Sequence, residues 1–265
     1  MIEPAALRPE QNPAYRLPFF FNSCVMKIEL TLSPPLYSHR QLVSPQVAVA
    51  VDVLRATSAI LAAFSAGVSE VVPLADLSRA EEYHSKGYLL AAEREGVKLC
   101  GATCGNSPVS YLSMDLHGRR LAWSSTNGTV AITTAEPHAS RLYVGAFANL
   151  SSLAARITAD FPDSLLILCS GWKGDPSIED TLFAGALVSA LQRSLPDVTL
   201  LNDAASASVD LYNLASHDLY SYCLKATHVQ RLLRLGCEDD IRWALRTDTV
   251  PLVPFFNPQS DSLIL

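Results

Sequence analysis

The chain has 265 residues, of which 49% are hydrophobic and 17% charged, and its mean hydropathy is positive at +0.19. This balance excludes intrinsic disorder, which requires low hydrophobicity and high net charge. The 20 basic and 26 acidic residues give a formal net charge of −6, so the basic surface that binds a nucleic-acid backbone is not expected. The length predicts one large domain or two small subdomains in intimate contact.

The most apolar stretch, residues 47–74, is interrupted by Asp52 and Arg55 before about 18 uncharged residues accumulate, so no membrane span is predicted. The short apolar run at residues 17–26 lacks a clean basic segment before it and a small-residue cleavage site after it, which argues against export. The six cysteines include no C-x-x-C pair and no zinc-like histidine spacing. They are typical of reduced, mostly buried thiols, and we expect a cytoplasmic protein.

The first 25 residues contain four prolines and show no periodicity, and a strand-like run opens at Met26. We expect residues 1–25 to be an extension outside the core, or the product of a misplaced start codon. Residues 26–265 are expected to form one α/β domain, within which two intimate subdomains are an alternative.

From residue 47 onward, short apolar runs alternate with helical patterns. Strand-like runs lie at residues 47–53, 70–74, 120–123, 142–145, 165–169 and 250–255. Apolar residues recur at helical spacing in 57–66, 150–157 and 182–191, and residues 202–235 are mainly helical by pattern. This alternation predicts βαβ units, hence a mostly parallel sheet with helices on both faces.

In open α/β sheets, ligands bind beyond the carboxyl ends of the strands, where helix N-termini attract anions. Unusual polar residues fall at four such junctions: 52–58 (DVLRATS), 105–108 (GNSP, expected before a strand), 124–129 (SSTNGT) and 169–181 (CSGWKGDPSIEDT). The carboxylate of Asp52 lies inside an apolar run, and a buried carboxylate needs a cation or several donors. Arg55 or a metal ion would serve, although Asp52 could simply cap a turn.

The other junctions also have ordinary structural explanations. An Asn-Gly pair such as Asn127-Gly128 is typical of a turn, but at a strand-to-helix junction it can bind phosphate oxygens. Glu179 and Asp180 can compensate a helix dipole, and Asp203 can cap a helix. The acidic run at residues 238–240 is interpreted as a solvated turn.

Several familiar mechanisms are excluded by their missing residues. There is no G-x-G-x-x-G motif, no P-loop lysine after Gly101 and no G-x-S-x-G elbow. Asp175 stands where a cysteine-based phosphatase needs arginine, and Leu54 stands where haloacid-dehalogenase-type phosphatases place a second aspartate. The remaining carboxylates, arginine, hydroxyls and amides suit a hard cation with an anionic oxygen ligand.

Taken in order, these motifs resemble the magnesium-dependent 2-phosphosulfolactate phosphatases. The matching segments are 52–58, 93–94 (ER), 105–108, 126–129 (TNGT), Asn149, Gly171, 179–181 (EDT), 184–185 (AG), 203–204 (DA), 240–241 (DI) and 250–251 (VP). They span roughly residues 26–255. Two departures stand out: GATC at 101–104 replaces the usual Gly-Phe-Asp-Leu, which bears on substrate choice, and Ser124-Ser125 replaces the commoner threonines.

The resemblance implies a three-layer α/β/α fold with a mixed, mostly parallel sheet. It also implies hydrolysis of (2R)-2-phospho-3-sulfolactate to 3-sulfolactate and phosphate, a reaction related to coenzyme M biosynthesis. Two alternatives stay open: a phosphatase of another small phosphorylated acid, and a non-catalytic binder of a phosphorylated metabolite.

On this hypothesis the catalytic residues are Asp52, Arg55 and Asp180, with Arg55 clamping the phosphate. Expected phosphate- or substrate-binding residues are Thr57, Asn106, Ser107, Ser125, Thr126, Asn127, Gly128 and Thr129. One Mg²⁺ is expected among Asp52, Glu179, Asp180 and Asp203, although Mg²⁺ usually takes only one or two carboxylates directly. Lys173 or Arg94 is the candidate partner for the acid tail of a small phosphorylated anionic substrate. The apolar composition also leaves room for a homodimer interface.

Overall fold

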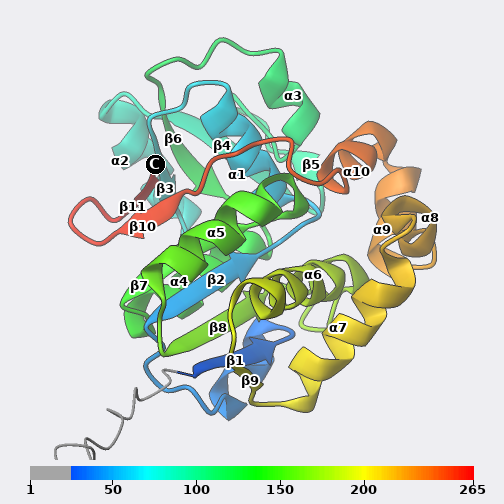
Figure 1. Ribbon diagram of the computed structural model, residues 1–265. Coiled ribbons are helices and arrows are strands. Elements are labelled where there is room, and N and C mark those ends of the chain that lie inside the picture. The colour runs from blue at the N-terminus through cyan, green and yellow to red at the C-terminus, as the bar shows by residue number, and fades with distance from the viewer. Residues whose placement is uncertain (1–24) are drawn as a thin grey trace, which may run out of the picture.

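The computed structural model describes residues 25–265 (Figure 1). The expectation of an extension at residues 1–25 therefore lies, apart from residue 25, outside the described part of the chain. The strands are β1 Met26–Thr31, β2 Val47–Val51, β3 Glu70–Pro73, β4 Leu89–Arg94, β5 Val97–Lys98, β6 Arg120–Ser124, β7 Arg141–Gly145, β8 Ser164–Cys169, β9 Val198–Leu200, β10 Phe255–Asn257 and β11 Ser262–Ile264. The helices are α1 Ala56–Ser65, α2 Ala80–Ser85, α3 Pro108–Leu112, α4 Gly128–Ala135, α5 Leu150–Asp160, α6 Ile178–Ser194, α7 Asp203–Ala215, α8 Leu219–Cys223, α9 Thr227–Arg234 and α10 Glu238–Ala244. Short 3₁₀ turns are η1 Pro34–His39, η2 Leu77–Arg79, η3 Glu136–His138 and η4 Phe147–Asn149.

The described strands form one mixed sheet in the order β5-β4-β6-β3-β11-β10-β7-β2-β8-β1-β9. Most of it consists of two parallel groups: β4, β6 and β3 in one, and β7, β2, β8, β1 and β9 in the other. The C-terminal hairpin β10–β11 pairs antiparallel with β7 and β3 and so joins the two groups. The predicted mixed, mostly parallel sheet is confirmed.

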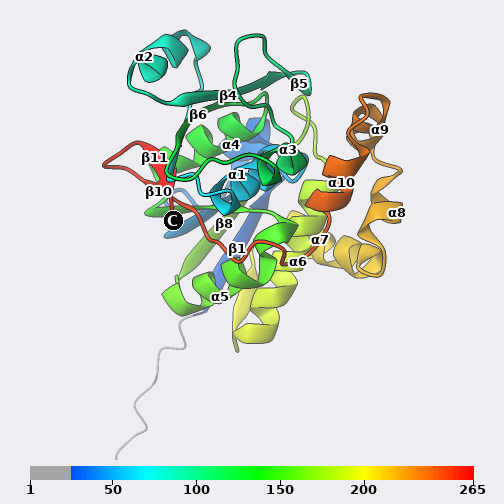
Figure 2. The same ribbon diagram turned by 90° about the horizontal axis from the view of Figure 1, so that it is seen from above.

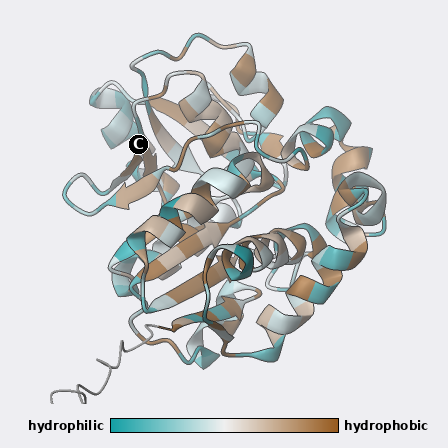
Figure 3. Cartoon of the chain, in the orientation of Figure 1, coloured by the Kyte–Doolittle hydropathy of each residue, from teal (hydrophilic) through white to brown (hydrophobic). Residues whose placement is uncertain are grey.

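Strand β2 shows why the centre of the sheet forms. All five residues of Val47–Val51 are buried, and β7 and β8 pair with it on either side. A strand covered on both faces reads as a continuous apolar run, as this one does. Figure 2 shows α5 and α6 on one side of β1 and β8 and α4 on the other, and Figure 3 shows the apolar residues concentrated in these strands. The three-layer α/β/α arrangement is thereby confirmed.

Two predicted elements differ from the structure. Residues 250–254 are an irregular segment, and β10 begins only at Phe255. Pro251 and Pro254 cannot donate to a strand ladder, which accounts for the shift. The 105–108 segment leads into helix α3 and not into a strand, because the Ser107 side chain caps that helix and Pro108 occupies its first turn.

The two parallel groups together position the functional site. Three antiparallel steps separate β7 from β3, so the groups run in opposite directions through the sheet. The carboxyl ends of β2, β4 and β6 nevertheless line one pocket, so the sheet must bend or twist strongly at the hairpin between them. Along residues 25–265, no helix combines the length and apolarity needed to cross a membrane.

Candidate active site

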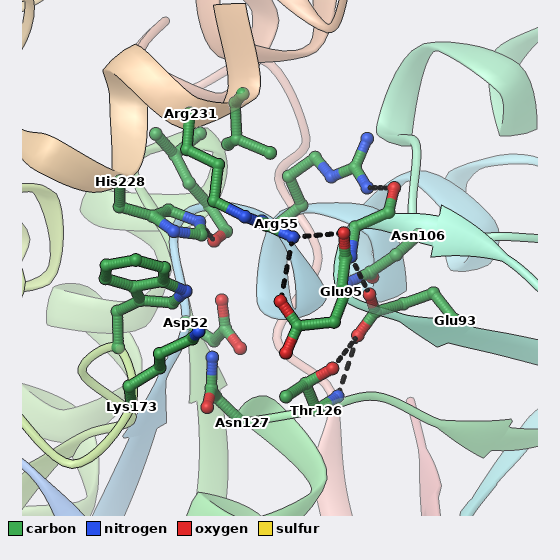
Figure 4. A pocket seen from close by; sticks show the side chains of 14 residues that line it. Asp52, Arg55, Glu93, Glu95, Asn106, Thr126, Asn127, Lys173, His228 and Arg231 are labelled. Atoms are coloured by element: carbon green, nitrogen blue, oxygen red, sulfur yellow. Dashed lines mark hydrogen bonds and ion pairs between the residues drawn. The ribbon is translucent and has the colours of Figure 1, made fainter. Parts of the chain in front are cut away.

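A pocket of about 400 Å³, its open mouth included, lies where the carboxyl ends of β2, β4 and β6 meet the loop after β8 and helix α9 (Figure 4). Its lining residues come from segments far apart in the sequence: Asp52, Leu54, Arg55, Glu93, Glu95, Gly96, Asn106, Thr126, Asn127, Trp172, Lys173, His228, Arg231 and Leu232. Six of the residues predicted from the sequence are among them: Asp52, Arg55, Asn106, Thr126, Asn127 and Lys173. The pocket occupies the position expected for a ligand site in an α/β sheet.

Asp52 follows directly on β2, and its conformation is fixed by the turn into α1. Its Oδ1 accepts a hydrogen bond from the Ala56 amide at 3.2 Å. The Thr57 hydroxyl donates to the Asp52 carbonyl at 2.8 Å and accepts from the Asp52 amide at 3.1 Å. Thr57 does not line the pocket, and its hydroxyl holds the turn that carries Asp52.

The buried carboxylates at this end of the sheet strongly influence one another. Burial, and after it the nearby charge of Asp180, raise the pKa of Asp52 to about 8. Burial likewise raises the pKa of Glu179 to about 8, with Asp180 again the second cause, and the pKa of Asp180 to about 6. Among the described residues none of the three forms an ion pair. Such a cluster must hold protons or attract a cation.

Asp180, which was predicted to be catalytic, does not line the pocket. Its Oδ1 accepts from the Val53 amide at 2.8 Å, and its Oδ2 accepts from the Gly171 amide at 3.1 Å and the Ser170 hydroxyl at 3.2 Å. These bonds tie the loop after β2 to the loop after β8. Asp180 therefore holds in place the loop that carries Asp52.

The four carboxylates predicted to share a metal ion are not one ligand set. Asp203 is exposed in the first turn of α7, beyond the edge strand β9, where Asn202 supplies the helix cap. Glu179 is buried and does not line this pocket, and its Oε2 has no hydrogen-bond partner among the described residues. Across residues 25–265, no three His, Cys, Asp or Glu side chains are placed to hold one metal ion. An acidic residue in the first turn of a helix favours the helix dipole, and its sequence pattern does not distinguish that role from metal binding.

The junction between β6 and α4 divides the predicted hydroxyl residues into two roles. Ser125 and Thr129 bond each other: the Ser125 amide donates to Thr129 Oγ1 at 2.9 Å, and the Thr129 amide donates to Ser125 Oγ at 3.1 Å. They cap α4 and do not reach the pocket. Gly128 begins the helix against Asp52, since a Cβ there would lie 2.7 Å from Asp52 Oδ2. Only Thr126 and Asn127 of this motif line the pocket.

Glu93, at the end of β4, organises the opposite wall. Its Oε1 accepts from the Thr126 amide at 2.7 Å and the Thr126 hydroxyl at 2.9 Å, and its Oε2 accepts from the Gly96 amide at 2.7 Å. The Glu93 side chain is 4% exposed. It ties the two strand ends together, a role that its place in a matching motif did not predict.

Arg55 is less free than the phosphate clamp predicted for it. Nη1 donates to Asp240 Oδ2 at 2.7 Å and lies 3.2 Å from Cys237 Sγ, while Nη2 donates to the Gly96 carbonyl at 2.7 Å. The expectation of a solvated turn at residues 238–240 is wrong for Asp240, which is 5% exposed. Ser107, predicted to bind substrate, donates to Asp240 Oδ1 at 2.5 Å and does not line the pocket.

Helix α9 and the loop after β8 supply residues that sequence reasoning missed. His228 Nε2 lies 3.0 Å from the Leu54 carbonyl, and burial lowers the His228 pKa to about 4. The neutral ring must therefore donate Nε2–H to that carbonyl, and it packs against Trp172 with ring centroids 5.4 Å apart. Arg231 bonds the Glu95 carbonyl and carboxylate. Single residues on an amphipathic helix carry no sequence signal that separates them from ordinary surface positions.

The pocket combines anion-binding groups with carboxylates. Lys173 lies over the Trp172 ring, its Nζ 5.1 Å from the centroid, and no ion pair engages it within the described residues. The side-chain amides of Asn106 and Asn127 line the pocket, and the buried Asn106 Oδ1 accepts no hydrogen bond from residues 25–265. In Figure 4 the Asp52 carboxylate points into the pocket, with the ends of Lys173 and Asn127 beside it in this view. This set can bind a small anion with several acidic groups.

Comparison with known proteins identifies the family. The family model described as 2-phosphosulpholactate phosphatase matches residues 33–259. A protein of Parasynechococcus marenigrum named "Probable 2-phosphosulfolactate phosphatase" is 39% identical over 216 residues, covering 80% of this chain and 89% of its own. Proteins of the same name from Microcystis aeruginosa and Trichormus variabilis are each 36% identical, covering 79% and 86% of this chain and 88% and 95% of their own. With these matches and a pocket suited to a small polyanion, the chain belongs to the 2-phosphosulfolactate phosphatase family.

Proposed function

We propose that this protein hydrolyses the phosphate monoester of a small 2-hydroxy acid, with 2-phospho-3-sulfolactate as the substrate and Mg²⁺ as the cofactor. Family membership supports the reaction class. The observation that carries the proposal is the pocket itself, where a buried carboxylate, an arginine, a lysine and two amides meet at the carboxyl ends of three strands. Figure 4 shows this grouping.

The residues present are compatible with one magnesium ion, held by fewer carboxylates than the sequence predicted. Mg²⁺ typically takes one or two protein carboxylates and completes its shell with water and substrate phosphate. Asp52 supplies such a carboxylate: burial and then the charge of Asp180 raise its pKa, and within residues 25–265 it forms no ion pair that would offset this. The Asn127 amide beside it adds a hard oxygen. A bound Mg²⁺ would supply positive charge to the phosphate oxygens, and it would be held by Asp52.

The remaining groups around Asp52 would bind and orient the phosphoryl group. Arg55 donates to its oxygens, and Asn127 with the N-terminus of α4 favours the same negative charge. Glu93 fixes Thr126 at the wall, so the site is held in shape before substrate arrives. Because phosphoryl transfer concentrates charge on peripheral oxygens, such positioned donors contribute most of the rate.

Lys173 and Arg231 would bind the acid tail of the substrate. Both line the pocket, and both stack near the Trp172 ring, with Lys173 Nζ 5.1 Å and Arg231 Cζ 5.9 Å from its centroid. Arg94 does not line this pocket; it bonds the Glu93 carbonyl and Ser124. The unusual residues 101–104 also lie outside the lining, so this departure from the family pattern leaves the proposed sulfonate contact intact.

The experiment compares phosphate release from 2-phospho-3-sulfolactate, 2-phospholactate and 2-phosphoglycerate, each with Mg²⁺ or with EDTA. The proposal expects Mg²⁺-dependent release that is fastest from the sulfonate. A uniform preference for another ester would instead assign that acid as substrate. Binding without release would favour a non-catalytic binder. Lys173→Gln should raise KM for the sulfonate about tenfold through loss of one ion pair. The control is Lys86→Gln, at the C-terminal end of α2, where Lys86 pairs with Glu82; it should leave KM unchanged.

A further inference from the structure

We propose that Asp240 is a positioning residue: it orients Arg55 so that the two uncommitted N–H groups of the guanidinium face the phosphoryl group. This inference rests on the proposed function, because it assigns to Arg55 the phosphate of that reaction. Asp240 itself does not line the pocket, and it acts on substrate only through Arg55.

The hydrogen bonds of Arg55 leave a defined pair of donors. A guanidinium has five N–H groups. Nη1 is occupied by Asp240 Oδ2 at 2.7 Å and Cys237 Sγ at 3.2 Å, and one hydrogen of Nη2 is occupied by the Gly96 carbonyl at 2.7 Å. Within residues 25–265, nothing accepts from Nε or from the second Nη2 hydrogen. These neighbouring nitrogens can engage two oxygens of one phosphate.

Asp240 is itself held from two directions, which makes it a rigid support. Its Oδ1 accepts from Ser107 Oγ at 2.5 Å, so α10 is joined to the start of α3 as well as to Arg55. Asp240 and Arg55 are both nearly fully buried, with side chains 7% and 6% exposed. A buried ion pair with a second hydrogen bond to the acid leaves the arginine few alternative rotamers.

Arg55 is held on its other side by the turn after β4. The Gly96 carbonyl accepts from Nη2, and the Gly96 amide donates to Glu93 Oε2, so the same turn is fixed to the pocket wall. The guanidinium is thus anchored by α10 on one side and the β4–β5 turn on the other. Removing Asp240 should release one anchor, leave an unpaired buried cation and allow Arg55 to turn away from the phosphate.

The first test uses Asp240→Asn, which keeps the shape and removes the charge, with Asp239→Asn as the matched control because Asp239 is exposed on the same helix. We expect Asp240→Asn to lower kcat about 100-fold and to raise KM about tenfold, because the misplaced Arg55 loses its contact with the bound phosphate as well as with the charge that develops during transfer. Ser107→Ala keeps the ion pair and removes only the hydrogen bond from Ser107 to Asp240 Oδ1. We expect kcat to fall about threefold to tenfold, and circular dichroism should show a folded protein. Wild-type kcat in both Asp240→Asn and Ser107→Ala would overturn the proposal.

The second test uses chemical rescue, which a merely structural role would not affect. Arg55→Ala should lose activity. Millimolar guanidinium should then raise the activity of this variant at least tenfold, by occupying the vacated site against Asp240. In Arg55→Ala/Asp240→Asn the same guanidinium should restore nothing. Equal rescue in both variants would contradict the assignment.

Binding of inorganic phosphate separates this inference from the proposed function. Calorimetry should show phosphate binding to wild type that is weakened at least tenfold in Asp240→Asn and unchanged in Asp239→Asn. If wild type binds phosphate but hydrolyses no ester, the proposed reaction fails while this comparison still decides the role of Asp240. Equal phosphate affinity in wild type and a folded Asp240→Asn would refute the positioning role.

Discussion

At the scale of single residues, Asp52 is the most informative side chain. It is a carboxylate placed at the end of a fully buried strand, and burial together with the charge of Asp180 raises its pKa to about 8. Folding does not favour such a group, because an apolar residue of similar size would avoid the desolvation cost. Asp52 is therefore best explained by what it binds in the pocket that it lines.

Replacing Asp52 by Asn should reduce kcat for phosphate release by about 10³-fold or more, because the carboxylate charge facing the pocket is lost. The fold should survive, since the amide keeps the shape of the protonated acid. Asp203→Asn is the control: Asp203 is exposed and outside the pocket, so kcat should stay within twofold. Near-normal kcat in Asp52→Asn, measured beside this control, would remove Asp52 from the chemistry.

The same carboxylates predict how stability depends on pH without divalent cations. The folded-state pKa values, about 8 for Asp52 and Glu179 and about 6 for Asp180, lie above the usual value near 4. Their stabilising contribution is therefore complete below pH 4 and is lost as pH rises through 6 to 8. With EDTA, the free energy of unfolding of Asp52→Asn should exceed that of wild type by an amount that grows between pH 6 and 8 and reaches about 2 kcal/mol or more. A difference in the free energy of unfolding that stays constant or shrinks over this range would show that folding does not raise the pKa of Asp52.

Single residues were the hardest part to predict from sequence. Asp52, Thr126 and Asn127 were identified because each stands where a strand ends and a helix begins. Asp240 was missed because an acidic run at a helix start is usually solvated, and only packing of α10 against α3 buries it. Likewise His228 acquires its role from a carbonyl 174 positions earlier in the chain.

At the scale of elements, the start of α4 shows how local structure shapes the pocket. Gly128 opens the helix where its backbone approaches the β2–α1 turn, and a Cβ at this position would lie 2.4 Å from Ala56 Cβ and 2.7 Å from Asp52 Oδ2. Ser125 and Thr129 satisfy the helix end between them. The helix terminus can thus lie against the Asp52 carboxylate only because residue 128 has no side chain.

Gly128→Ala should therefore push α4 away from Asp52, lowering the stability by about 1–3 kcal/mol and kcat/KM at least tenfold. Gly118→Ala provides the comparison: it has φ +69° and nothing within 4 Å of a Cβ, so backbone strain should cost about 1 kcal/mol while activity remains. Thermal melts and phosphate release on both variants make the measurement. Similar kcat/KM for the two would mean that the approach of α4 to Asp52 does not matter.

Elements were easier to predict than side chains. The runs that became β2, β6, β7 and β8 are short and apolar, and β2 contains three valines, so their length and their polar flanks identified them as strands. Strand β4 was not predicted, because the charged residues Glu93 and Arg94 follow its apolar part, Leu89–Ala92. The Ser-Ser-Thr-Asn-Gly-Thr motif indicated a junction, but its sequence could not distinguish hydroxyls that cap a helix from those that face a ligand.

At the scale of the whole molecule, the C-terminal hairpin holds the two parallel groups together. Leu263 in β11 is fully buried, pairing with Val71 of β3 and Phe256 of β10. Because the pocket takes residues from both groups, its geometry depends on this connection. The alternation of strands and helices predicted parallel groups, but the insertion of the last hairpin between β3 and β7 depends on long-range packing that no local pattern records.

Leu263→Ala should cost about 2–4 kcal/mol, the usual range for a buried leucine, and should lower kcat/KM because the two walls of the pocket lose their common support. Leu265→Ala, with Leu265 55% exposed two residues later, should change stability by less than about 0.5 kcal/mol. Denaturant titrations of both variants report the difference. A Leu263→Ala protein as stable as Leu265→Ala would show that the hairpin does not join the groups energetically.

The central claim is that this pocket removes phosphate from a small phosphorylated 2-hydroxy acid. The most direct measurement is ³¹P NMR of the purified protein mixed with 2-phospho-3-sulfolactate and Mg²⁺, followed over time. The account predicts that the ester resonance decays catalytically into inorganic phosphate and that EDTA stops the decay. An ester resonance that stays unchanged at high protein concentration, with Mg²⁺ present and the protein folded, would contradict it.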